Sequence, residues 1–361
     1  ISFDNRFGID WGNTTGTLRW NHLWNDKVFS NTSLIFSNYD YKVAILRADD
    51  EFSIKSDIRD YNLKHEFQYF PNSSNTIRFG FNSIFHQITP GQVEAPEGSD
   101  FSPAKLQTRY ALENAVYFSN DWKAATRINI SYGLRGSSFA LLGPGDFYAF
   151  NDAGNVADTT NYATGKVVKA YFYLEPRLSA SFMLDEKQSV KTAYTRNAQN
   201  LHLITNSTST TPTDLWIPSS ALVKPEISDQ FSLGYFRNFN SNKYEFGTEI
   251  YYKAMQNQVD LKNGAEIRSN ELIEGELLFG QGRAYGLEVL LKKKQGKITG
   301  WIGYTLSRTE RQIDGINDNN WYVARQDATH DVSIVGIYDL NKKWSFSASW
   351  VYNTGNAVTF P

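Results

Sequence analysis

The stretch NKKWSFSASWVY (residues 341–352) contains the pattern that decides the fold. A short polar turn at 341–343 is followed by apolar residues at 344, 346, 348, 350 and 352, and serines occupy 345, 347 and 349. Strict alternation of this kind predicts a β-strand with one apolar and one polar face, because a helix needs apolar residues at i, i+3, i+4 and i+7. We therefore predict a two-faced strand that begins directly after a tight turn.

The same alternation recurs along the chain. It is clearest at 77–86, 122–134, 174–184, 244–253, 285–292 and 298–307. We predict about fifteen strands, many of them longer than the ~10 residues that cross a membrane at a tilt of ~45°. The extra length indicates strands that rise above the bilayer on one side.

The connections between these strands fall into two classes. Short polar turns are predicted at 25–27, 71–75, 119–121, 185–188, 240–242, 294–296 and 341–343. Long connections are predicted at 88–104, 140–166, 197–225, 255–281 and 308–328. In an up-and-down meander every second connection lies on the same rim, and one rim of short turns with one of long loops is typical of an outer-membrane β-barrel. The short turns would then be periplasmic, and the long loops would face outward and select the substrate.

Aromatic residues gather beside the short turns. They are Trp24, Phe70, Phe118, Trp122, Phe239, Tyr244 and Trp344. Rings collect at a membrane interface because one edge can be hydrated while the rest stays in hydrocarbon. A soluble propeller or sandwich fits less well, because no blade repeat is visible and charged residues inside single strands would be hard to bury. The predicted fold is all-β: a transmembrane, antiparallel, up-and-down barrel.

Composition narrows the possible functions. The 361 residues contain 36 Lys and Arg against 38 Asp and Glu, so no strong field favours nucleic acid, and no nucleic-acid partner is expected. There is no cysteine and therefore neither a disulfide nor a thiol site. No apolar run reaches the 18 residues of a transmembrane helix. The chain opens on a strand-like 1–3 without a signal peptide, and we interpret it as a segment of a longer protein.

Little in the sequence indicates catalysis. The five histidines are dispersed, without the spacing of a metal site, and no Ser/His/Asp set can be assembled from the sequence. We therefore predict no enzymatic activity, no metal site and no cofactor.

Several segments are similar to those of one known family. They are LEPR (174–177), SVKTAYTR (189–196), QNLHLI (199–204), KPE (224–226), DQFSLGY (229–235), GRAYGLE (282–288) and WVYNTGN (350–356). Distributed over several strands, they resemble the barrel of TonB-dependent receptors, particularly those of Bacteroidetes-type bacteria. The resemblance implies a 22-stranded barrel around an N-terminal plug. Residues 1–361 would then form a partial barrel domain, with the plug and the remaining strands outside this segment.

The resemblance also implies a function. It implies active import across the outer membrane of a bulky nutrient such as a metal chelate, corrinoid, glycan or peptide, with energy delivered by TonB through the plug. The implied partners are TonB, outer-membrane lipid and the nutrient ligand. The alternative is a passive porin, whose barrel usually needs only about 16–18 strands.

Two groups of residues are predicted to make contacts. Aromatic residues in the long loops would meet the ligand, because planar faces bind sugars and chelates, although packing of loop on loop explains any one of them equally well. These are Phe147, Tyr148, Phe150, Trp216, Trp321 and Tyr322. Polar residues on the inner faces of strands would bond the plug. These are Arg127, Arg135, Glu175, Arg177, Glu249 and Glu288.

Overall fold

The computed structural model describes residues 5–47, 50–94, 106–151, 154–205, 214–265 and 270–355. The strand expected at 1–3 lies outside these residues. Within them, no helix is long and apolar enough to cross a membrane.

Nearly all the regular structure is β-strand. The strands are β1 (Asn5–Asn25), β2 (Val28–Arg47), β3 (Asp50–Asn72), β4 (Asn75–Glu94), β5 (Arg109–Ala125), β6 (Ile128–Leu142), β7 (Gly145–Phe150), β8 (Val156–Tyr162), β9 (Val167–Asp185), β10 (Gln188–Gln199), β11 (Leu201–Ile204), β12 (Leu215–Pro218), β13 (Glu226–Phe239), β14 (Tyr244–Leu261), β15 (Leu277–Lys293), β16 (Ile298–Ile313), β17 (Tyr322–Val323), β18 (His330–Asn341) and β19 (Trp344–Asn353). Two short 3₁₀ helices, η1 (Ile273–Glu276) and η2 (Asn317–Asn319), lie in connections.

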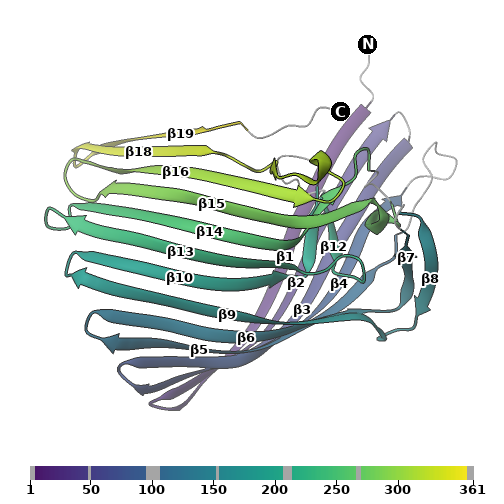
Figure 1. The fold of residues 1–361 in the computed structure, drawn as a ribbon, viewed down its shortest axis with the longest axis horizontal. Helices are drawn as coiled ribbons and strands as arrows, with labels where there is room; N and C mark the ends of the chain where they lie inside the picture. The colour runs from purple at the N-terminus through teal and green to yellow at the C-terminus, as the bar shows by residue number, and fades with distance from the viewer. Residues whose placement is uncertain are drawn as a thin grey trace.

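One antiparallel sheet of fifteen strands forms the wall (Figure 1). Its order follows the chain from β1 to β6 and then runs through β9, β10, β13, β14, β15, β16, β18 and β19, with β17 paired beside β16. Two further hairpins, β7–β8 and β11–β12, pair only with themselves. The predicted up-and-down antiparallel architecture is confirmed.

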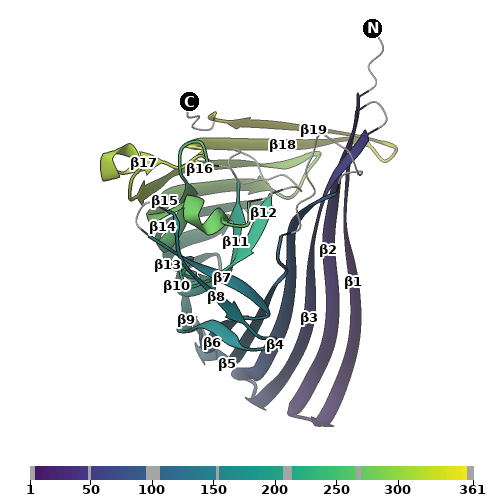
Figure 2. The same cartoon turned by 90° about the vertical axis from the view of Figure 1, so that its right-hand side faces the viewer.

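The two faces of the sheet differ as the alternation predicted. Phe79, Phe118 and Leu134 follow one another across β4, β5 and β6, and each remains about two-fifths exposed or more. The next row along the same strands contains Tyr117 and Arg135 and is polar. The sheet curves into a trough, and the β11–β12 hairpin lies on its concave side (Figure 2).

Bonds from the inner hairpin identify the concave face as the polar one. Asn200, at the base of β11, donates to Glu113 at 2.9 Å and also to the hydroxyl of Tyr173. Tyr171 donates to the carbonyl of Ser220, just after β12, at 2.6 Å. These wall residues share the face of Arg135 in the register, so the apolar face is convex.

The short turns are confirmed at six of the seven predicted positions, but the turn predicted at 119–121 is wrong. Residues 119–121 lie inside β5, and the turn falls at Thr126 and Arg127. The strand predicted across 122–134 is therefore two strands, β5 and β6.

Cross-strand partners explain this error. Asn120 donates to Asn75 at 2.8 Å and to the hydroxyl of Tyr132 at 3.1 Å. Asp121 accepts from Arg78 at 2.6 Å and from Ser131 at 2.7 Å. The side-chain amide of Asn120 and the carboxylate of Asp121 thus find partners within the sheet, while the true turn contains no glycine, proline or asparagine to mark it.

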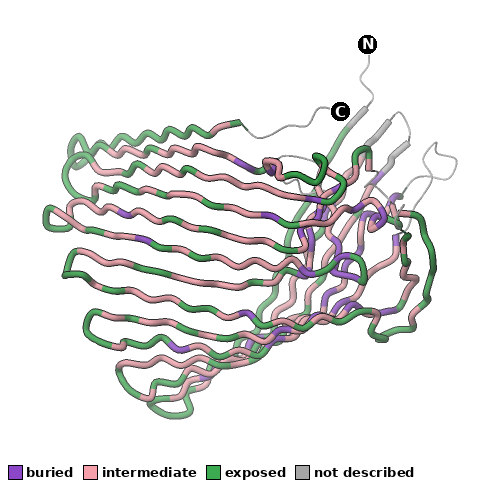
Figure 3. Tube along the Cα trace, in the orientation of Figure 1, coloured by how far each residue is buried: buried purple, intermediate pink, exposed green. Residues whose placement is uncertain are grey.

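The opposite rim carries five long connections, as predicted, although β4 continues to Glu94 and shortens the first of them. A further connection on this rim, between β2 and β3, has only the two residues 48–49. Buried segments concentrate at this end of the trough (Figure 3). The fold therefore buries its few enclosed side chains where the long connections turn inward.

Candidate functional site

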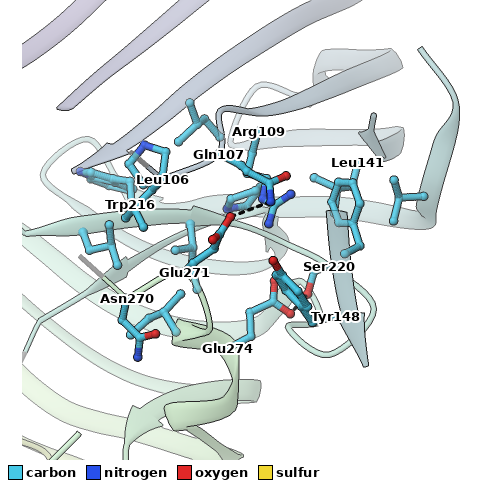
Figure 4. Close-up of a pocket in the computed structure, with 18 of the residues that line it drawn as sticks. Leu106, Gln107, Arg109, Leu141, Tyr148, Trp216, Ser220, Asn270, Glu271 and Glu274 are labelled. Carbon is cyan, nitrogen blue, oxygen red and sulfur yellow. Dashed lines mark hydrogen bonds between the residues drawn. The ribbon is translucent and has the colours of Figure 1, made fainter. Parts of the chain in front are cut away.

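A pocket lies on the concave side, at the long-connection end of the wall. It is built by β4, by the starts of β5 and β9, by the end of β6, by the β7 and β12 hairpin strands and by η1 (Figure 4). Its free volume is about 80 Å³. One water needs a space of ~10–15 Å³, so the pocket is large enough for several waters or for a group of about one ring.

Most of the pocket lining is apolar, and it includes four of the six aromatic residues predicted to contact ligand. These are Phe147, Tyr148, Phe150 and Trp216. Trp216 and Tyr148 lie on opposite sides of the pocket in Figure 4. An apolar enclosure with a few directed polar groups is typical of a ligand site.

The β11–β12 hairpin reaches this position because its apolar side chains are buried under the long connections. Ile204, Ile217 and Val223 form one cluster with Val259 of β14 and Ile273 of η1. Each of these side chains is less than a tenth exposed. Burying a large aliphatic side chain contributes roughly 1.5–3 kcal/mol, so this cluster stabilises the hairpin in the position that places Trp216 at the pocket.

The β7–β8 hairpin is held by a different cluster. Phe147 packs against the buried Phe139 and Leu141 of β6. The guanidinium of Arg109 lies over the Phe147 ring, 4.4 Å from its centroid, and donates to the carbonyl of Asp146 at 2.9 Å. Arg109 therefore supports one wall of the pocket.

Two carboxylates lie on the η1 side. Glu271 accepts from Gln107 at 2.6 Å, the bond drawn in Figure 4. Glu274 accepts from the hydroxyl of Ser220 at 2.7 Å. Burial raises the pKa of the Glu274 carboxyl, although Ser220 and Arg109 act in the opposite direction. The site therefore contains one partly exposed acid and one shielded acid.

The other two predicted aromatic residues lie away from this pocket. Trp321 stacks on the guanidinium of Arg283, 4.1 Å from the ring centroid. Figure 2 shows β17, which follows Trp321, on the side of the sheet away from β11 and β12. Tyr322 donates to Asp260 at 2.9 Å, and burial together with that carboxylate raises the pKa of its phenol.

Sequence reasoning missed a buried polar group under the β11–β12 hairpin. Nε2 of His202 lies 2.9 Å from the hydroxyl of Ser219, and its Nδ1 lies 3.6 Å from Glu226. The order of these groups is that of a hydrolytic triad, but Ser219 and His202 are at most 1% exposed. No substrate can reach the hydroxyl there, so the group ties the hairpin to the start of β13.

Five of the six residues predicted to face the plug lie on the polar concave face. Arg135 reaches Glu175 at 3.4 Å, and Glu175 also accepts from Ser137 at 2.5 Å. Arg177 shares this face and donates to Asn197 at 3.0 Å. Glu249 and Glu288 are cross-strand neighbours, which makes that part of the wall acidic.

The sixth, Arg127, does not line the wall. It lies in the turn between β5 and β6 and donates to the carbonyl of Leu184 at 3.3 Å. The turn at Thr126 and Arg127 explains the difference, because the alternation across 122–134 predicts a single strand at this point.

Comparison with known proteins identifies the family. A family model described as TonB dependent receptor-like, beta-barrel, matches residues 1–360. The chain belongs to this family. No curated protein matches the chain.

Solved structures share the fold of this TonB-dependent receptor barrel. The copper transporter OprC superimposes with a TM-score of 0.70 at 12% identity, covering 96% of this chain and 53% of OprC. The ferric-catecholate import receptor Fiu of E. coli K12 gives a TM-score of 0.63 at 13% identity, covering 94% of this chain and 53% of Fiu. FpvA of P. aeruginosa, bound to pyoverdines, gives 0.64 at 11% identity, with coverages of 94% and 46%. The receptor barrel thus spans about half the length of each.

Proposed function

We propose that this chain forms the barrel wall and outer loops of a TonB-dependent importer of a bulky nutrient in the outer membrane. The observation that carries the proposal is the pocket, to which segments from four separate long connections contribute. Family membership supports the same function. The similar structures include importers and receptors of metal chelates, whose ligands are candidates of the same broad class.

The inward hairpin favours active import over a passive porin. β11 contacts β14, and β12 contacts β4, so the hairpin bridges distant strands across the concave side. A diffusion pore needs an open lumen, whereas a site that captures a ligand needs walls that enclose it. A passive porin is the alternative function, and growth and conductance distinguish the two.

The proposal includes a plug and further strands. In the described sheet β1 and β19 each pair on one side only. Unpaired edges are costly in hydrocarbon, which supports closure by additional strands into a barrel of about 22. The acidic wall at Glu249 and Glu288 and the charged wall at Arg135, Glu175 and Arg177 would then face the plug, through which TonB acts.

The orientation follows from the two rims. The short turns would be periplasmic, and the pocket would open to the outside, with Phe147, Tyr148, Phe150 and Trp216 at the ligand. Trp321 and Tyr322 belong to the proposal only as residues of the same outer rim. A Bacteroidetes-type source is also part of the proposal, from the resemblance of the quoted segments.

Growth and conductance together test this function. Strains that lack either this gene or TonB are grown on limiting iron chelates, corrinoids, glycans and peptides, and the full-length protein is inserted in planar bilayers. We expect the same growth defect in both strains and little conductance. A growth defect in the strain that lacks this gene, with no such defect in the strain that lacks TonB, would establish the porin instead if the protein also shows a large open conductance.

A further inference from the structure

The ionisable groups around the pocket are unevenly divided. Glu271 and Glu274 line it, and Asp146 lies beside it on β7. Arg109 is the one basic side chain among the described lining residues, and all three carboxylates lie close enough to interact with it electrostatically. Lys262 lies just outside the lining and donates to the carbonyl of Gly275 in η1 at 2.6 Å, so the described surroundings of the pocket contain three carboxylates against two basic groups.

The guanidinium of Arg109 already has partners within the protein. It lies over the ring of Phe147 and donates to the Asp146 carbonyl at 2.9 Å. An anionic ligand would have to compete for this one cation against neighbouring carboxylates. Like charges at such distances disfavour binding, more strongly where water is partly excluded.

The aromatic residues of the pocket favour the opposite charge. Tyr148, Phe150 and Trp216 contribute aromatic surface. A cation over such a face is attracted by the ring quadrupole, and the attraction increases as water is removed. In Figure 4 Glu271 lies between Trp216 and Tyr148, so an acid and two rings meet in one space.

We propose that this pocket binds a cationic group, an ammonium or guanidinium, attached to an apolar body about one ring in size. The inference rests on the proposed function, because it names the ligand chemistry of the same site. The ring-sized body follows from the free volume of about 80 Å³, and the positive charge follows from the carboxylates and ring faces.

Three probes that share a phenylethyl body test the charge preference. Calorimetry on the purified full-length protein compares 2-phenylethylamine, 3-phenylpropanamide and 3-phenylpropionate. We expect the amine to bind roughly tenfold more tightly than the carboxylate, with the neutral amide between them. Equal or tighter binding of the carboxylate overturns the inference, as does the absence of binding by the amine at 10 mM.

A matched pair of variants locates the effect. Glu271→Gln removes a charge from the lining, and Glu276→Gln removes the same charge from η1 outside it. We expect the first to reduce the amine-to-carboxylate ratio at least threefold and the second to leave it unchanged, with amide binding retained as the sign of a folded site. Equal effects of both variants overturn the assignment to this pocket.

The binding assay does not involve TonB. Amine selectivity in a protein whose uptake is independent of TonB would reject the proposed function and leave this inference intact. TonB-dependent uptake together with tighter binding of the carboxylate would support the proposed function and reject this inference.

Discussion

In the proposed outer-membrane barrel the apolar convex face contacts lipid, and a charge placed at either of two adjacent positions of β13 tests this orientation. Leu233 is about half exposed on the apolar face, and Ser232 lies on the concave face. Leu233 precedes Phe239, which stacks on Tyr244 beside the short turn with ring centroids 5.2 Å apart. Six residues at ~3.3 Å each and a tilt of ~45° place Leu233 about 14 Å above that ring, close to the middle of a ~25 Å apolar band.

Leu233→Lys should therefore lower the free energy of unfolding by about 2–4 kcal/mol. This is a ~30- to 1,000-fold change in the folding equilibrium. Ser232→Lys should cost less than about 1 kcal/mol, because its charge remains in the lumen, and the backbone carbonyl that accepts from Thr192 is retained. The measurement is urea unfolding of the full-length protein in phospholipid vesicles, followed by tryptophan emission. A larger cost for Ser232→Lys than for Leu233→Lys would show that the faces have been assigned the wrong way round.

Three further predictions concern the wall and the pocket. Gly300→Ala should destabilise the barrel by about 2–5 kcal/mol, because φ of Gly300 is +146° and a Cβ would lie 2.0 Å from a backbone carbonyl oxygen. Its register partner Gly336 has open space around it, so Gly336→Ala should be tolerated, and the urea midpoints of the two variants measure the difference. Trp216→Ala should weaken phenylethylamine binding at least fivefold in calorimetry, while Trp321→Ala, which removes a ring stacked outside the pocket, should leave it unchanged. Burial raises the pKa of Glu274, so this carboxyl ionises at a higher pH than an ordinary glutamate. Amine affinity should therefore continue to rise with pH above about 4.5 until Glu274 is ionised, and Glu274→Gln should flatten that rise.

The alternation in the sequence was enough to predict the sheet and its two faces. Every second residue of 174–184 in β9 is apolar, and Leu174, Leu178 and Phe182 from this series are exposed on the convex face. Such a pattern survives folding because each strand makes the same contacts with its two neighbours. Turn position is less securely encoded, since Asn120, a residue type that favours turns, lies inside β5 and donates its side-chain hydrogen bonds to neighbouring strands.

The pocket could be predicted only in part. Aromatic residues in long connections were recognisable, but the sequence contains nothing that distinguishes Trp216 from Trp321. Trp216 enters the pocket because Ile204 and Ile217 beside it are buried in the hairpin cluster, whereas Trp321 is retained by Arg283. The bond between His202 and Ser219 depends on the register of β11 with β12, which no local pattern predicts.

The present volume of the pocket bears on how a bulky nutrient could be accommodated. A space for one ring is below the ~300–1,000 Å³ that encloses a larger ligand, so under the proposed function import of a bulky nutrient would require this site to widen. Separating two wall strands would break a ladder of backbone hydrogen bonds, but β11–β12 pairs only with itself and meets the wall through side chains and a few single bonds. Moving this hairpin away from β4 therefore costs apolar contacts and a small number of hydrogen bonds and leaves the fifteen-stranded sheet unchanged.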